Sequence, residues 1–349
     1  MPDVTARPAL FARQPWLLLT GLSLLAMFAL VLALVSGSVP ISLADIGTLL
    51  WQDPQSSDAQ MNTQILRELR LPRALAAFVT GAMLALSGVM MQVLLRNPLA
   101  DPYILGISGG SAAGALLVIT LGVSGIWITQ AAFVGALFSV LLVFGLAGRQ
   151  FNWSATRLLL TGVVIASGWG ALINIMLSTS TSQNVQSMLF WLMGDLSLSR
   201  SSVWHYLVLL GVLLFMLLQA RPLNAMARGD LQAAALGVNV KRLRLGLYFC
   251  AALLTATAVT IAGTVGFVGL VVPHMLRLIG ARNHYLLLPA SALLGGSFLL
   301  LADSLARTVM APQQLPVGVL TASLGVPVFL LILHHNARRQ SNASLQSGS

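Results

Sequence analysis

The sequence predicts an all-α polytopic membrane protein with about ten transmembrane helices. Of its 349 residues, 57% are hydrophobic and only 8% are charged, whereas ordinary soluble domains carry roughly 25% charged residues. Apolar stretches of roughly 18 to 23 residues recur along the chain, and about 20 residues of helix are needed to cross a hydrocarbon core about 30 Å thick. A soluble fold of this length could not bury that much apolar surface, so lipid is the expected solvent for most of the chain.

The predicted spans form one transmembrane domain that takes up residues 1–349. They lie at residues 15–36, 74–95, 103–122, 126–148, 157–178, 203–220, 245–263, 264–281, 286–306 and 316–335. An even number of spans puts both termini on one side, and placing them in the cytoplasm assigns fourteen of the nineteen Lys and Arg residues to cytoplasmic segments. That excess is the one expected for cytoplasmic loops. Five basic residues remain for the opposite side: Arg67, Arg70, Arg73, Arg200 and Arg307.

Two runs of glycine predict local features of the helix packing. The first has a glycine at every fourth position and the second at every third: Gly106, Gly110 and Gly114, and Gly263, Gly266 and Gly269. Spacing by four places glycines on one helix face, where two backbones can approach closely in lipid. Spacing by three predicts a strained or broken helix. The simpler alternative is that glycine is common in membrane helices.

One loop stands out on the predicted cytoplasmic side. Residues 221–244 hold five of the fourteen basic residues assigned there, including Lys241, the only lysine of the chain. No other predicted cytoplasmic loop is large enough to dock a partner protein. The segment from Ala233 to Leu236 favours a short helix, and Gly237 is suited to end it. A solvated basic loop without a partner is the simpler alternative.

Residues that would perform covalent chemistry or bind a metal are not found in a suitable pattern. Because Lys241 lies in VNVKRLR, the chain has no G-x-x-x-x-G-K-[ST] loop for ATP. The five histidines lack Cys or carboxylate partners at ligand spacing. We therefore expect no metal site, no cofactor and no enzyme activity in this chain. The net charge of +10 is dispersed between spans, which argues against a nucleic-acid-binding surface.

Four segments carry a resemblance to a known family. They are RELRLPRALAAFVTGAMLALSGVMMQVLLRNPLADPYILGISGGSAAGALL (Arg67 to Leu117), GTVGFVGLVVPHMLRLIG (Gly263 to Gly280), LLLPASALLGGSFLLLADSLAR (Leu286 to Arg307) and LPVGVLTASLGVPVFLLIL (Leu315 to Leu333). In this order they resemble the FecCD/vitamin B12-type family of ABC importer permeases. The resemblance implies the type II importer permease fold.

The resemblance also implies a function. Members of the family are permease subunits of ATP-binding cassette importers that carry a metal chelate (a ferric siderophore, haem or cobalamin) across the bacterial inner membrane. Two copies form a homodimer, two separate ATPase subunits bind ATP and Mg, and a periplasmic or extracellular substrate-binding protein delivers the substrate. The form NPLADPYILGIS is similar to that of vitamin B12 and haem importers somewhat more than to some siderophore importers.

Candidate site residues for docking and gating follow by similarity. Arg70, Arg73 and Arg307 match arginines that receive acidic side chains of the binding protein; the alternative is three arginines that snorkel to the interface. Asn97 and Leu99 match residues that close the cytoplasmic end of the pathway, although an Asn-Pro pair is also a general turn signal. Thr156 is the nearest match to a further constriction before the fifth span.

The segment that couples the permease to the ATPase is implied at the loop of residues 221–244. Its candidate residues are Asp230, Ala234, Leu236, Gly237 and Lys241. A packed helical projection is what an ATPase needs in order to push on the membrane domain as a rigid body.

A secondary transporter driven by an ion gradient is the alternative function. Such a transporter needs carboxylates or histidines inside the membrane to couple ion movement to transport. Asp303 is nearly alone there, and the large loop would be unexplained. Since Asp303 lies four residues before Arg307, the two side chains can pair along one helix face.

Overall fold

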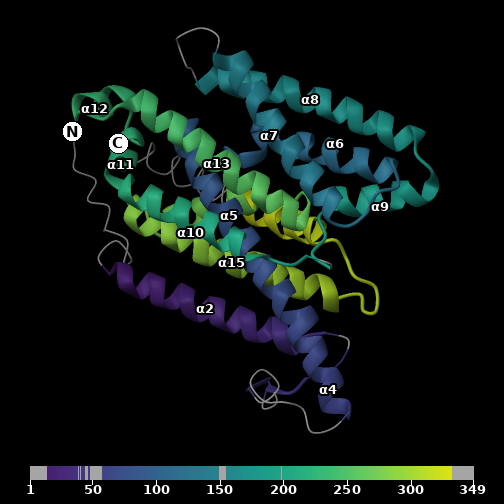
Figure 1. Cartoon of the computed structure of the whole chain (residues 1–349). Helices are drawn as coiled ribbons and strands as arrows, with labels where there is room; N and C mark the ends of the chain where they lie inside the picture. Colours follow the sequence, from purple (N-terminus) through teal and green to yellow (C-terminus); the bar gives the residue numbers. More distant parts are fainter. Residues whose placement is uncertain are drawn as a thin grey trace, which may run out of the picture.

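The computed structural model is a bundle of α-helices (Figure 1). It describes residues 14–37, 39, 41–43, 46–47, 57–148, 155–197 and 199–331, and this part of the chain contains no β-strand. The helices are α2 (Pro15–Val35), α4 (Ser57–Gln64), the π-helix η1 (Ile65–Arg70), α5 (Leu71–Leu94), the 3-10 helix η2 (Pro102–Leu105), α6 (Ile107–Thr120), α7 (Ile126–Gly148), α8 (Ala155–Thr179), α9 (Ser182–Met193), α10 (Val203–Leu218), α11 (Ala220–Met226), α12 (Asp230–Ala235), α13 (Val240–Ala262), α14 (Val268–Leu278) and α15 (His284–Thr308), followed by a final helix, Val317–Leu331.

The helix pattern confirms the predicted fold class. Within the described residues, six helices are long and apolar enough to cross a membrane, and α10 with α11 makes a seventh span that is bent by 65°. Three shorter apolar helices, namely α6, α14 and the final helix, coincide with the remaining predicted spans. Each of the ten predicted ranges therefore contains an apolar helix, although three of these helices are shorter than a full crossing.

Helix α5 is the centre of the bundle. It lies among α10, α13 and α15 (Figure 1), and 89% of its most apolar window is buried. Glycine allows this close packing: a Cβ atom added to Gly81 would lie 2.2 Å from the carbonyl oxygen of Gly295, and one added to Gly88 only 1.9 Å from that of Gly269. Because hydrophobic burial does not drive helices together in lipid, such backbone contacts carry much of the association.

The first glycine run packs as predicted at two of its three positions. A Cβ atom on Gly110 would lie 2.5 Å from the carbonyl oxygen of Gly135, and one on Gly114 would lie 2.2 Å from that of Ala131, so both glycines sit in the contact between α6 and α7. Gly106 has another role. It adopts φ +69 between η2 and α6, a left-handed conformation that glycine adopts without steric cost. The helix therefore begins four residues later than predicted.

The second glycine run breaks the helix, as its spacing predicted. Gly263 ends α13 with φ +66, and Phe267 precedes α14 with φ +69. A β-carbon-bearing residue with positive φ is uncommon, which marks this connection as tightly constrained. As a result α14 has only 11 residues, whereas the prediction was a full span over residues 264–281.

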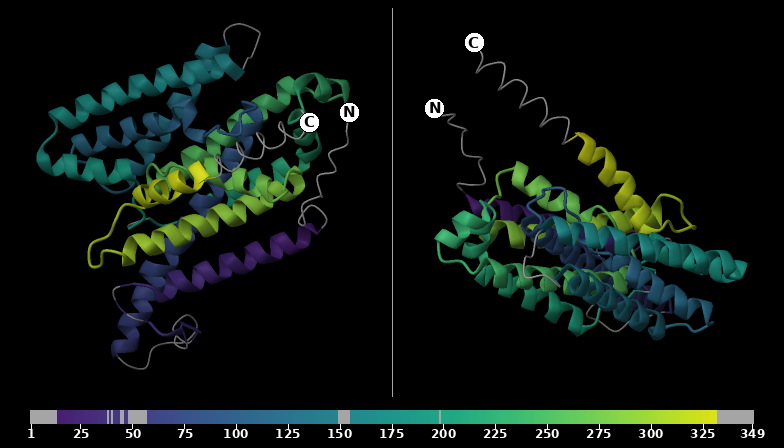
Figure 2. Two further views of the ribbon diagram at one scale, coloured as in Figure 1. Left: turned by 180° about the vertical axis from the view of Figure 1, so that it is seen from behind. Right: turned by 90° about the horizontal axis from the view of Figure 1, so that it is seen from above.

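The helices at the edge of the bundle have little protein around them. Only 11% of the apolar window of α8 is buried. The final helix leans out from the other helices when the molecule is seen from above (Figure 2, right). These two helices contrast with α5 and leave free surface for lipid or for another protein.

Candidate functional sites

Candidate residues gather at two opposite ends of α5. One end holds the arginine cluster, which consists of Arg70, Arg73, Asp303, Arg307 and Gln314. The other end holds the knob, residues 220–239, which contains α11 and α12. Helix α5 starts beside the cluster and ends beside the knob (Figure 1).

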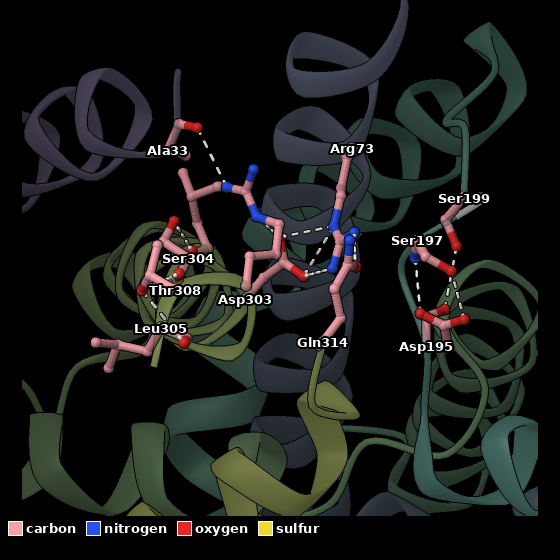
Figure 3. Close-up of polar contacts among 12 residues, drawn as sticks. Ala33, Arg73, Asp195, Ser197, Ser199, Asp303, Ser304, Leu305, Thr308 and Gln314 are labelled. Carbon is pink, nitrogen blue, oxygen red and sulfur yellow. Dashed lines mark hydrogen bonds and ion pairs between the residues drawn. The ribbon is translucent and has the colours of Figure 1, made fainter. Parts of the chain in front are cut away.

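The centre of the arginine cluster is a buried ion pair between α5 and α15. Asp303 is fully buried, and both of its carboxylate oxygens accept hydrogen bonds from Nε of Arg73, at 3.1 and 3.0 Å. Nη2 of Arg73 donates a third bond of 2.8 Å to Asp303 (Figure 3). Nη1 of Arg73 donates to Oε1 of Gln314 at 2.8 Å. A guanidinium bound in this forked way has a fixed orientation as well as a fixed position.

Arg307 joins the same carboxylate. Its Nε lies 3.3 Å from Oδ2 of Asp303, which confirms the pairing predicted from their spacing of four residues. Its Nη2 donates to the carbonyl oxygen of Ala33 at 3.2 Å, so Arg307 also ties α15 to α2 (Figure 3).

Arg70 binds backbone rather than a carboxylate. Its Nη1 donates to the carbonyl oxygens of Leu34 and Val35, at 2.6 and 2.9 Å, and its Nη2 donates to that of Val39. The last carbonyls of a helix have no partner within the helix. Arg70 supplies partners for the end of α2 and carries positive charge where the helix dipole favours it.

All three predicted docking arginines thus lie in the cluster with internal partners. Their relative exposures are 5% for Arg70, 7% for Arg73 and 9% for Arg307, which is less than snorkelling arginines would have. The cluster contains three guanidinium groups and one carboxylate, so it keeps an excess of positive charge. Whether this charge receives a binding protein stays a prediction.

Sequence reasoning missed the partners of Arg70 and Arg73. Arg73 and Asp303 are 230 residues apart in the chain, and nothing in the local pattern marks Gln314. One signal was available. A buried carboxylate inside a membrane segment needs a cation, and Arg73 is one of the five basic residues that the predicted topology puts on the same side as Asp303.

The predicted gate residues lie in the turn after α5 and at the start of α8. Oδ1 of Asn97 accepts the backbone N–H of Leu99 at 2.9 Å, and the carbonyl of Asn97 accepts that of Ala100 at 3.0 Å. Leu99 is 40% exposed. Thr156 is exposed in the first turn of α8, and no hydrogen bond among the described residues joins it to the turn. The structure therefore brings Asn97 and Leu99 together, while the gating role of all three stays a prediction.

The same turn is bonded to the broken connection before α14. Oδ1 of Asp101 accepts the backbone N–H of Tyr103 at 2.8 Å and caps η2. The Tyr103 hydroxyl then donates to the carbonyl of Val265 at 3.1 Å and accepts from its N–H at 3.0 Å. Burial raises the pKa of the Asp101 carboxyl to about 6, and the Tyr103 N–H partly opposes that rise. The Asp101 carboxyl and Tyr103 hydroxyl are further polar groups that the sequence did not single out.

The knob ends in a compact helical turn. The predicted short helix is present as α12 and begins earlier than predicted, at Asp230. Gly237 adopts φ +79, its N–H donates to the carbonyl of Ala234 at 2.9 Å, and the N–H of Val238 donates to that of Ala233 at 3.0 Å. These two bonds form a Schellman motif, in which glycine takes the left-handed position. The helix-ending role of Gly237 is confirmed.

Asp230 fastens the knob to two other elements. Its carboxylate pairs with Arg96, directly after α5, and with Arg244 on α13. Its place in the first turn of α12 also suits the positive end of the helix dipole. Through Arg96, the knob is connected to the turn that holds Asn97 and Leu99. The sequence marked Asp230 but not these partners.

The surface of the knob is apolar and exposed. Leu236 is 70% exposed, while Ala234, Gly237 and Lys241 are also on the surface. Leu231, which the sequence did not single out, is 88% exposed. Contiguous exposed apolar patches are typical of protein contact sites. The knob thus combines an exposed apolar surface with ion pairs to Arg96 and Arg244.

The acidic side chains of the two sites are paired with arginines. Over the described residues, no group of three or more His, Cys, Asp or Glu side chains is placed to hold a metal ion. The carboxylates at the two sites, Asp303 and Asp230, are each bound by two arginines.

Comparisons with known proteins agree with this architecture. A family model described as the FecCD transport family matches residues 24–335. The vitamin B12 import system permease protein BtuC of Escherichia coli O17:K52:H18 is 39% identical over 322 residues, which is 91% of this chain and 94% of that protein. An uncharacterised ABC transporter permease protein, YvrB of Bacillus subtilis, is 37% identical over 90% of this chain and 92% of its own.

A solved structure gives the same result in three dimensions. It is an inward-facing conformation of an ABC transporter assigned to the metal-chelate type, with a TM-score of 0.79 and 32% identity. The match covers 91% of this chain and 98% of that one. The fold and the two sites define a multi-span transport permease, which is not an enzyme.

The chain belongs to the FecCD transport family and is an ABC importer permease of the type to which BtuC belongs.

Proposed function

We propose that this permease imports a metal chelate, such as cobalamin, haem or a ferric siderophore, across the bacterial inner membrane. The observation that supports an importer of this kind is the knob, because Asp230 connects this exposed apolar surface to the end of α5 and to α13. A permease that is driven by ATPase subunits outside the bilayer needs such a rigid projection for those subunits to push on. The similarity to a vitamin B12 import permease makes cobalamin the first candidate.

The power source in this proposal is a pair of ATPase subunits that bind ATP and Mg. They contact the knob at Asp230, Ala234, Leu236 and Gly237, and they also contact Lys241 just after it. This end of the bundle faces the cytoplasm, and in this proposal both chain termini are on the same side of the membrane. The distribution of Lys and Arg along the chain supports that orientation. Closing of the ATPases moves the knob, and the ion pair between Arg96 and Asp230 carries the movement to the turn with Asn97 and Leu99.

A second copy of the permease completes the pathway. Ser167, Asn174 and Ser178 are exposed along one face of α8. An amide facing hydrocarbon would lack hydrogen-bond partners, which is costly. A homodimer places this face against the partner copy or along the water-filled path between the two, where Thr156 at the start of α8 forms the further constriction.

At the other end, the arginine cluster receives the substrate-binding protein. Its excess positive charge, from Arg70, Arg73 and Arg307, attracts acidic side chains and orients the encounter. Replacing Arg307 by Glu should weaken binding of the substrate-binding protein at least tenfold in surface plasmon resonance on folded, monodisperse permease. Arg200→Glu is the matched control, because Arg200 is exposed outside the cluster. Equal affinities for both variants would contradict the docking role.

The test of the power source is copurification followed by transport. An ATPase subunit should copurify with the tagged permease, and uptake in proteoliposomes should require ATP and survive collapse of the proton gradient. Uptake that needs the gradient and not ATP would establish the secondary transporter instead. The structure offers little for that alternative, since Asp303 is already bound by two arginines.

The substrate is best identified through the binding protein. We expect its melting temperature to rise with one member of a panel of cobalamin, haem and ferric siderophores, and that compound to be transported. A binding protein stabilised by none of these compounds would contradict the chelate proposal.

A further inference from the structure

One cavity beside the knob has a composition that neither docking nor coupling explains. It has a volume of about 630 Å³, within the range of about 300–1,000 Å³ that is typical of small-ligand sites. It lies where α10 turns by 65° into α11, against the first turns of α13. We call it the bend pocket. The lining residues that matter here are Phe215, Arg221, Leu236, Gly237, Arg242 and Gly246.

The polar side of the bend pocket is cationic. Arg221 and Arg242 both line it, and no carboxylate does. Within the described residues, neither guanidinium has an ion pair: the acid on the knob, Asp230, is bound by Arg96 and Arg244. The side-chain oxygen of Asn239 caps the start of α13, which leaves its amide N–H₂ available as a donor. Two free guanidinium groups beside a helix N-terminus favour a phosphate group.

The other side of the bend pocket is apolar, and exposed apolar side chains follow it along α10 and α13. Phe215 and Leu243 form part of this wall. Gly246 lies opposite the ring of Phe215, since a Cβ atom there would make an ordinary van der Waals contact with it, at 3.7 Å. Next to the pocket, Leu218 is 70% exposed and Phe249 is 43% exposed. A ligand with its phosphate on the arginines could therefore lay a hydrocarbon chain along α10 and α13.

We propose that the bend pocket binds the headgroup of an anionic phospholipid, with Arg221 and Arg242 on the phosphate and an acyl chain against Phe215 and Gly246. Basic pockets between membrane helices at the level of the headgroups recognise such lipids. Because Leu236 and Gly237 close one edge of the pocket, the bound lipid supports the base of the knob. The lipid thereby holds the knob at a fixed angle to α10.

The test measures retained lipid on the purified full-length chain. Native mass spectrometry after delipidation and titration with phosphatidylglycerol or phosphatidylcholine should show one tightly retained phosphatidylglycerol per chain and no retained phosphatidylcholine. Each of Arg221→Gln and Arg242→Gln should weaken binding about fivefold, and the double variant roughly thirtyfold, from about 1 kcal/mol for each basic residue near a lipid surface. Gly246→Leu, which fills the apolar wall and keeps the charge, should also reduce retention.

The matched control is Arg228→Gln. Arg228 is an exposed arginine of the same loop and does not line the pocket, so its variant should retain phosphatidylglycerol like the wild type. An equal loss in Arg228→Gln would mean diffuse attraction by the basic loop and would overturn the proposal. Displacement of the lipid by millimolar inorganic phosphate or glycerol 3-phosphate would assign the pocket to a soluble anion and overturn it as well. Unchanged phosphatidylglycerol binding in both the double variant and Gly246→Leu would also overturn the proposal.

Discussion

The two ends of α5 use ion pairs in opposite ways. In the arginine cluster, Asp303 is fully buried and its two arginines are less than 10% exposed. At the knob, Asp230 and Arg96 keep 31% and 41% of their side-chain surface exposed. Buried pairs that lose a partner cost far more than exposed pairs. The cluster therefore fixes the positions of α2, α5 and α15, whereas the knob pair can transmit movement without deciding whether the chain folds.

Replacing Asp303 by Asn should give the largest effect. It leaves Arg73 and Arg307 buried without a counter-charge, which should destabilise the fold by about 3–5 kcal/mol. The measurement is the melting temperature and monodisperse yield of the purified chain. Asp195→Asn is the control, because within the described residues the Asp195 carboxylate accepts hydrogen bonds only from Ser197 in its own turn (Figure 3). Equal stability of both variants would remove the distinction between the two ends.

Replacing Gly237 by Val should affect coupling more than stability. A β-branched residue at φ +79 strains the end of α12, at a cost of roughly 1–2 kcal/mol. We expect ATP hydrolysis of the assembled importer to continue while uptake falls at least fivefold. Gly237→Asn is the matched control, since Asn tolerates the left-handed conformation. Normal uptake by the Val variant would refute the coupling role.

Asp230→Asn should change stability less than Asp303→Asn does, by about 1–2 kcal/mol, because the side chains of Asp230 and Arg96 stay 31% and 41% exposed and only that of Arg244, at 16%, is largely buried. Its effect on transport should still be clear, since the link between the knob and Arg96 is lost. Uptake per ATP hydrolysed in proteoliposomes is the quantity to measure. A loss of stability as large as that of Asp303→Asn would show that the knob, too, holds the fold together.

The smallest expected effect at neutral pH is that of the Asp101 carboxyl, which changes stability only as the pH falls through its folded pKa. Its folded pKa of about 6 lies above the unfolded value of about 4. The folded state therefore binds the proton more tightly, so stability should rise as the pH falls from 7 through 6 toward 4. We expect the melting temperature to rise by a few degrees Celsius over that window, and Asp101→Asn to remove this component. An unchanged pH profile in the variant would contradict it.

The residue pattern alone determined a large part of this protein. The length and spacing of apolar runs set the helical membrane fold, because the thickness of the bilayer fixes how long a crossing must be. The glycine run from Gly263 predicted the break before α14, and Gly237 predicted the end of α12, because both depend on local backbone conformation. The spacing of Asp303 and Arg307 predicted their pairing for the same reason.

Only the tertiary structure decided what the other charged groups bind. Arg73 pairs with an acid 230 residues away, Arg70 caps a helix that ends 35 residues earlier, and Arg96 holds Asp230 across the end of the bundle. These partners are set by which helices pack side by side, and helix packing in lipid depends on close backbone contacts such as Gly88 on Gly269. Local sequence fixes a helix and its ends, but the neighbours of a helix follow from the whole bundle.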